Sequence, residues 1–182
     1  MPRTMLPTSI LAALLALGAT ACSGSPAASG GDECRDGAPA GVGGEFEVTL
    51  SGAETLELCG FATSSEGPDG VGWSVLLLTP GGGNSLLFAT EHTGRPVPNT
   101  YDVVDPVATD ATPMADDYFV LIALNDDVLG ATGLSSVTGT LTITFSSEGQ
   151  VSGQFDFSAR EGLESGAVIN VTGTFTADNE DS

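Results

Sequence analysis

The chain has 182 residues, of which 24 are acidic and only four are basic, so its formal net charge is −20. Affinity for nucleic acid comes mainly from lysine and arginine side chains that displace counterions, so this composition argues against a nucleic-acid partner. Hydrophobic residues make up 41% of the chain, which is enough for the core of one domain preceded by a leader.

The N-terminus has the features of a secretory signal peptide. Arg3 supplies a positive charge, residues 10–17 (ILAALLAL) form a short apolar core, and four small residues (GATA, 18–21) precede Cys22. The apolar stretch is shorter than the roughly 20 residues that a transmembrane helix needs. We therefore expect residues 1–21 to be a signal peptide that is removed from the mature protein.

Small residues that end in Cys22 resemble the lipobox of bacterial lipoproteins, although Ala19 stands where that motif usually has leucine. The resemblance implies cleavage before Cys22, acylation of its thiol and a lipid anchor in the membrane of the bacterial cell envelope. Ser23 follows the cysteine, rather than the aspartate that retains lipoproteins at an inner membrane. The serine at this position therefore favours the outer membrane as the destination if the cell has two membranes. The alternative is cleavage after Ala21 without acylation, which would release a soluble secreted protein.

Residues 22–44 read as a flexible tether. Ser, Gly, Ala and Pro dominate residues 23–31 (SGSPAASGG), which is the composition of a flexible linker. If it is fully flexible, the whole tether has a root-mean-square reach of about 26 Å. It would connect the lipidated Cys22 to a folded body.

From Glu45 onward, apolar and polar residues alternate with a period of two, and no window shows a helical period. We predict an all-β domain over residues 45–177, followed by an acidic tail over residues 178–182 that frays. An antiparallel meander of eight or nine strands, closed as a barrel or as a two-layer sandwich, fits the short glycine-rich connections. The expected strands cover residues 45–50, 56–61, 72–79, 85–90, 100–104, 118–124, 139–146, 151–158 and 169–175.

Two of these strands give specific expectations about facing. The segment 118–124 (YFVLIAL) is apolar on both faces, which is typical of a strand covered on each side. In the segment 139–146, alternation predicts that Leu141, Ile143 and Phe145 point inward while the threonines point outward. Trp73 and Tyr118 lie in apolar strands, so we expect them in the core rather than on a ligand platform.

The C-terminal part of the chain carries a second resemblance. Residues 139–159 (GTLTITFSSEGQVSGQFDFSA) and 169–175 (INVTGTF) are similar to a recurrent pattern of uncharacterised β-rich bacterial lipoproteins. That resemblance implies an envelope lipoprotein of unknown function. Its motifs are structural alternations and turns, so it implies no catalytic residue.

Three cysteines are present, at positions 22, 34 and 59. With Cys22 taken by lipid, two remain in a protein that matures where thiols oxidise, so we predict a disulfide between Cys34 and Cys59. The bridge would clamp the tether over the outer face of the sheet. It would close a loop that the chain-entropy account values at about 3.5 kcal/mol.

The sequence offers little for catalysis. His92 is the only histidine, and we place it in a loop after the fourth strand, without a nucleophile motif beside it. We expect no catalytic residue and no cofactor. We also expect no metal site, although one candidate group of oxygen ligands for Ca²⁺ lies in the long connection before residue 118. This group, which also reads as a solvated acidic loop, contains Asp102, Asp105, Asp110, Asp116 and Asp117.

Three functions remain open at this point. The first is a membrane-anchored envelope lipoprotein with a non-catalytic β domain that binds a partner or has a structural role. The second is a carrier of a small apolar ligand in a lipocalin-like barrel, which requires an unfilled interior. The third, which we place last, is a hydrolase that uses carboxylates.

Overall fold

The computed structural model describes residues 34, 43–52, 55–67, 70–106, 116–126, 130–161 and 166–179. The signal peptide and the tether lie outside these residues, except for Cys34, Gly43 and Gly44. The described part is nearly all β. Its nine strands are β1 (Glu45–Ser51), β2 (Thr55–Glu66), β3 (Val71–Leu78), β4 (Ser85–Thr93), β5 (Asn99–Val104), β6 (Phe119–Asp126), β7 (Gly130–Ser146), β8 (Gln150–Glu161) and β9 (Val168–Asn179).

Eight of the strands close into an antiparallel barrel in the order β1-β2-β3-β4-β6-β7-β8-β9. Closure comes from the antiparallel pairing of β9 with β1, in which Phe175 lies opposite Phe46. The domain is therefore a barrel rather than a sandwich. Within the described chain, all nine strands expected from the sequence are present.

Strand β5 is the extra strand, and it extends the wall past the beginning of β6. Strand β7 has 17 residues. Its residues 130–135 pair with β6 and its residues 138–143 pair with β5. Between these halves the register shifts at Ser136 and Thr138. The Ser136 hydroxyl accepts a hydrogen bond from the Val120 amide and donates one to the Val104 carbonyl, which joins β6 to β5.

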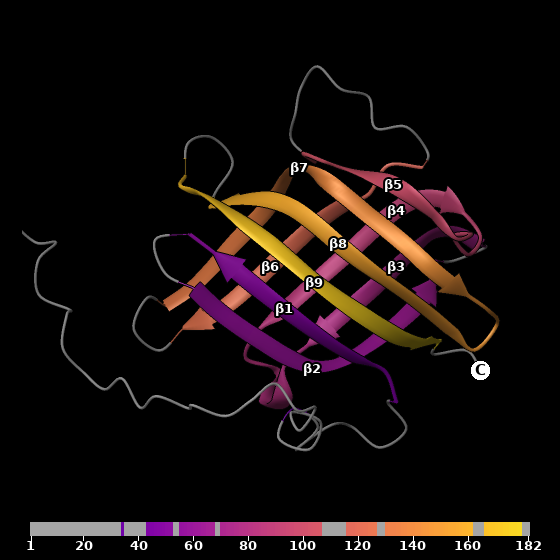
Figure 1. Ribbon diagram of the computed structural model, residues 1–182, viewed down its shortest axis with the longest axis horizontal. Coiled ribbons are helices and arrows are strands. Elements are labelled where there is room, and N and C mark those ends of the chain that lie inside the picture. Colours follow the sequence, from indigo (N-terminus) through magenta and orange to yellow (C-terminus); the bar gives the residue numbers. More distant parts are fainter. Residues whose placement is uncertain are drawn as a thin grey trace, which may run out of the picture.

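The barrel has two opposite walls, seen in Figure 1 as one layer of strands crossing in front of another. We call β7, β8, β9 and β1 the front wall, and β3, β4 and β6 the rear wall. Strand β2 connects the two walls because it pairs with β1 on one side and with β3 on the other.

Phenylalanine rings and glycines fill the interior together. In three inward-facing cross-strand pairs, Phe155 lies opposite Gly173, Phe175 opposite Gly153, and Phe46 opposite Gly60. A Cβ at Gly173 would come within 2.7 Å of the Phe155 ring, and one at Gly153 within 3.0 Å of the Phe175 ring. Each glycine thus leaves the space in which the ring of its partner lies, an arrangement known from aromatic rescue of strand glycines.

The two walls meet at Phe88 of β4. Its ring centroid is 4.8 Å from that of Phe155, 5.9 Å from that of Phe157 and 6.3 Å from that of Phe175. These rings belong to one continuous cluster of buried side chains that includes inward residues of both walls. The described interior is therefore packed by side chains.

Three expectations about single residues were wrong. Phe145 is half exposed rather than buried, because a register shift between Ile143 and Phe145 breaks the alternation. Asp178, expected in the frayed tail, lies in β9, where it pairs in parallel with Thr63 of β2. Leu121 on β6 is 45% exposed, so the outer side of this strand is not fully covered.

Candidate functional site

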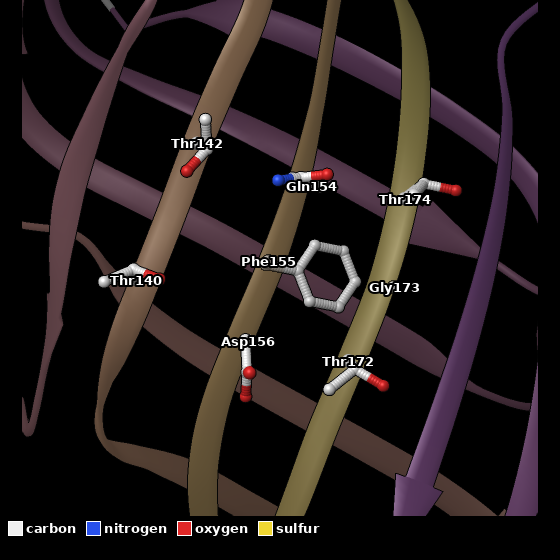
Figure 2. A pocket seen from close by; sticks show the side chains of 8 residues that line it. All are labelled: Thr140, Thr142, Gln154, Phe155, Asp156, Thr172, Gly173 and Thr174. Carbon is white, nitrogen blue, oxygen red and sulfur yellow. The ribbon is translucent and has the colours of Figure 1, made fainter.

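A shallow groove lies on the outer surface of the front wall, with a volume of about 280 Å³. Figure 2 shows its side chains, which come from three neighbouring strands. Alternation places the threonines, Gln154 and Asp156 outward, whereas Phe155 and Gly173 face inward beneath them. The groove is lined by Thr140, Thr142, Gln154, Phe155, Asp156, Thr172, Gly173 and Thr174.

Register brings these residues together. Thr142, Gln154 and Thr174 lie opposite one another across β7, β8 and β9, and so do Thr140, Asp156 and Thr172. The Phe155 ring points toward Gly173 beneath these two rows (Figure 2). The groove thus has hydroxyl and amide rims and a small apolar floor.

The lining of the groove is rich in hydrogen-bonding groups. Threonine hydroxyls and the Gln154 amide can donate and accept, and Asp156 supplies the one carboxylate among the lining residues. Glycoside hydrolysis needs two carboxyl groups that flank the scissile bond, and this lining does not provide a second.

An aromatic cluster lies inside the barrel where β5 overlaps β6. Tyr118 packs edge-on against Trp73 at 6.2 Å between ring centroids and against Tyr101 at 5.3 Å. Trp73 and Tyr118 are core residues, as the sequence predicts. The Tyr101 hydroxyl donates a hydrogen bond of 2.7 Å to the Val97 carbonyl. Burial raises the pKa of both phenols, and the effect is larger at Tyr118, whose buried hydroxyl has no hydrogen-bond partner among the described residues.

The single histidine does not lie in a loop. His92 belongs to β4, and its Nδ1 atom is 2.6 Å from Oδ1 of Asp116, the residue two positions before Tyr118. Asp116 is largely exposed, so this pair is a surface contact worth about 1 kcal/mol or less. The pair links the end of β4 to the segment that enters β6.

The structure does not gather the acidic residues of the candidate Ca²⁺ site. Asp102 lies on the outer face of β5, Asp105 forms an ion pair with Arg160 of β8, and Asp116 pairs with His92. Asp110 lies outside the described residues. Within the described ranges, no group of three or more His, Cys, Asp or Glu side chains is placed to hold a metal ion.

Cys34 and Cys59 are joined by a disulfide with 5.5 Å between their Cα atoms, which is the pairing that the sequence predicts. Cys59 lies on the outer side of β2, between the inward-facing Leu58 and Gly60. The bridge therefore fixes residue 34 against the outside of the barrel wall. Cys22 lies outside the described residues.

Comparison with protein-family models, with curated proteins and with solved structures finds no significant match. The two resemblances noted in the sequence thus stay predictions. Among the described residues, no helix combines the length and the apolar character needed to cross a membrane.

Sequence reasoning missed the groove because it depends on the register between three strands. The signal was nevertheless present. Threonine occurs at every second position in residues 140–144 and in residues 172–176, on either side of a strand that alternates Phe with Gln and Asp. Once β8 is placed between β7 and β9, these threonines must share one face.

Proposed function

We propose that this protein is an exported lipoprotein of the bacterial cell envelope, held to a membrane through acylated Cys22. Its barrel would be a rigid, non-catalytic module that acts through its outer surface. The observation that carries this proposal is the disulfide between Cys34 and Cys59. It suits a compartment in which thiols oxidise, and it leaves Cys22 as the remaining cysteine of the three.

The position of the disulfide supports the role of residues 22–33 as a tether. Cys34 is attached to the outer side of β2, so a pulling force on the tether would act on β2 through the disulfide rather than on the N-terminal end of β1. A covalent attachment at this point would protect β1 from being pulled out of the sheet in a domain that is held to a membrane by its N-terminus.

The contacts of the described polar residues favour a non-catalytic role. His92 is engaged by an exposed aspartate, and Asp105 is engaged by Arg160. The groove of the front wall offers hydroxyl groups with a single carboxylate. We propose that this groove contributes to contact with a polar partner.

A carrier of a small apolar ligand is the second candidate, and the closed eight-stranded barrel is compatible with it. The packing of the interior speaks against it, because Phe88, Phe155, Phe157 and Phe175 meet in the middle of the barrel. A ligand would have to displace these rings, which are at most 4% exposed. We therefore rank the carrier below the anchored module.

Metabolic labelling with a palmitate analogue tests the anchor. Cells that express the wild-type protein should incorporate the label and retain the protein in the membrane fraction. The Cys22→Ala variant should do neither, whereas the Ser23→Ala variant serves as a matched control and should behave like wild type. Equal labelling of wild type and Cys22→Ala would contradict the proposal.

A further inference from the structure

The outer surface of the rear wall carries apolar side chains on three neighbouring strands. Leu76 of β3, Leu87 of β4 and Leu121 of β6 lie opposite one another in register, and all three point outward. Directly opposed side chains on one face of a sheet are close enough to touch. The three leucines therefore form a continuous row across the wall, in which Leu121 is 45% exposed.

Flanking rows extend this surface. Leu78 and Ala123 lie outward on one side of the leucine row, and Ala89 and Phe119 lie outward on the other. Only Ser74, Ser85 and Asn125 interrupt the outward apolar positions over residues 74–78, 85–89 and 119–125. We call the seven apolar residues the rear patch: Leu76, Leu78, Leu87, Ala89, Phe119, Leu121 and Ala123.

The absence of charge from the rear patch is notable in a chain with 24 acidic residues. The outward positions of β1 and β8 carry Glu45, Glu47 and Asp156, and those of β2 and β5 carry Glu57 and Asp102. On the rear wall, Glu91 near the end of β4 also points outward, but it lies beyond the rear patch, two residues after Ala89. A surface from which charge is excluded suits contact with an uncharged, apolar medium.

The place where the tether is attached indicates what that medium is. Cys59, which holds Cys34, lies two residues before Phe61 on the outer side of β2, and Phe61 lies opposite Leu78 of the rear patch. Cys34 is thus held near the edge of the rear patch. Cys34 comes twelve positions after Cys22, and this segment has a root-mean-square span of about 19 Å if it is flexible.

We propose that the rear patch rests on the surface of the lipid bilayer that holds Cys22, so that the front wall with its groove faces away from the membrane. This inference rests on the proposed lipid anchor. The anchor keeps the barrel within reach of the membrane, and the leucine row gives the barrel a preferred side. Burial of apolar side chains at the lipid boundary provides the driving force.

Tryptophan fluorescence on vesicles tests the orientation. The mature chain beginning at Cys22 has one free thiol, because Cys34 and Cys59 are paired, so it can be coupled to a maleimide-bearing lipid. The vesicles consist of dioleoylphosphatidylcholine, with or without brominated acyl chains that quench indole emission on contact. The native Trp73 is 2% exposed and provides a constant background.

Two variants carry one additional indole on opposite walls, Leu121→Trp in the rear patch and Thr142→Trp in the front wall. For Leu121→Trp, brominated chains should quench roughly half of the added emission, as expected for a side chain at the acyl boundary. For Thr142→Trp they should leave the emission unchanged. Adding Leu87→Glu to Leu121→Trp should abolish the quenching, with near-ultraviolet circular dichroism verifying the fold.

Equal quenching at both positions, or none at either, would overturn the proposal. A shift of Leu121→Trp emission that depends on protein concentration in the absence of lipid would show that a second copy covers the patch, which also overturns it. Because the coupling is chemical, this experiment does not depend on acylation in the cell. A failed anchor appears in the palmitate labelling, and a failed orientation appears only here.

Discussion

The front and rear walls of the barrel enclose the same core but differ in what they present outside. Strands β1, β8 and β9 of the front wall have phenylalanine and glycine inside and threonine, glutamine and carboxylates outside. The rear wall carries leucine on both faces, so Leu86 is fully buried inside while its neighbour Leu87 points outward. The residues on the inner faces are selected by packing in the core. We infer that the residues on the two outer faces differ because the two walls face surroundings of different polarity.

The largest difference is expected between neighbours on the front wall. Phe155 is 4% exposed and packs on Phe88, so Phe155→Ala should cost about 3–5 kcal/mol of unfolding free energy. Asp156 points into solvent, and Asp156→Ala should change stability by about 0.5 kcal/mol or less. Urea titration of both variants measures this contrast, and similar losses at the two positions would show that the register of β8 is wrong.

The corresponding pair on the rear wall sharpens the comparison. Leu86→Ala should cost about 2–5 kcal/mol because Leu86 is completely buried. Leu87→Ala removes a leucine that is only half-buried, and it should cost about 1 kcal/mol or less. Chemical denaturation again provides the measurement. A loss at Leu87 as large as that at Leu86 would mean that the outer leucines are needed for folding, which would weaken the case for a membrane role.

Glycines on the front wall provide the next effect. Gly173→Ala would place a Cβ within 2.4 Å of the Glu47 carbonyl oxygen and 2.7 Å of the Phe155 ring, so we expect a loss of about 1–3 kcal/mol. Gly83 has helical dihedral angles and open space around it. Gly83→Ala should therefore stabilise the protein by about 0.4–1 kcal/mol through the unfolded state. Equal effects in thermal melts would contradict the Phe–Gly packing.

The smallest effect concerns Tyr118, where β5 and β6 meet. Tyr118→Phe removes a buried hydroxyl without a hydrogen-bond partner, so the variant should be more stable by about 1 kcal/mol at neutral pH. Burial raises the pKa of Tyr118 in the folded protein. The unfolded chain ionises at the usual tyrosine pKa of 10.0, whereas the folded protein keeps the proton. The free energy of unfolding of the wild type is therefore unaffected by this ionisation below pH 10.0 and falls as the pH rises above that value.

The free energy of unfolding, measured as a function of pH, distinguishes the wild type from the Tyr118→Phe variant. The advantage of Tyr118→Phe over wild type should widen above pH 10, where the wild type must keep a proton that its unfolded chain releases. Tyr101→Phe is the control. The Tyr101 hydroxyl donates a hydrogen bond to the Val97 carbonyl, so this variant should be less stable than wild type at neutral pH. A Tyr118→Phe variant less stable than wild type at neutral pH would show that the hydroxyl has a partner.

The sequence predicted the strands well because period-two alternation is a local signal. It located all nine, together with the inward faces of Leu141 and Ile143. The prediction failed where the structure depends on pairing between strands rather than on the local sequence. The register shift that exposes Phe145 depends on how β7 pairs with β8. The first half of β7 (GATGLSSVT, 130–138) lacks alternation, and it forms a strand because β6 pairs with it.

The candidate sites were less predictable because they depend on which strands become neighbours. The Cys34–Cys59 disulfide could be predicted, since counting cysteines leaves few alternatives. The groove and the rear patch could not, since both depend on the barrel order. The apolar segment 118–124 indicated a strand covered on both faces. Covering by another part of a protein and contact with a membrane leave the same pattern in a sequence.

The lipid anchor is the claim on which the orientation of the two walls depends, and the intact mass of the protein tests it most directly. Protein extracted from membranes with detergent should have a mass that corresponds to a chain beginning at Cys22 plus a diacylglyceryl group, with or without a further acyl chain on its amine. Digestion should place the added mass on the N-terminal peptide. A chain that begins at Cys22 without added lipid, or one that retains residues 1–21, would contradict the account.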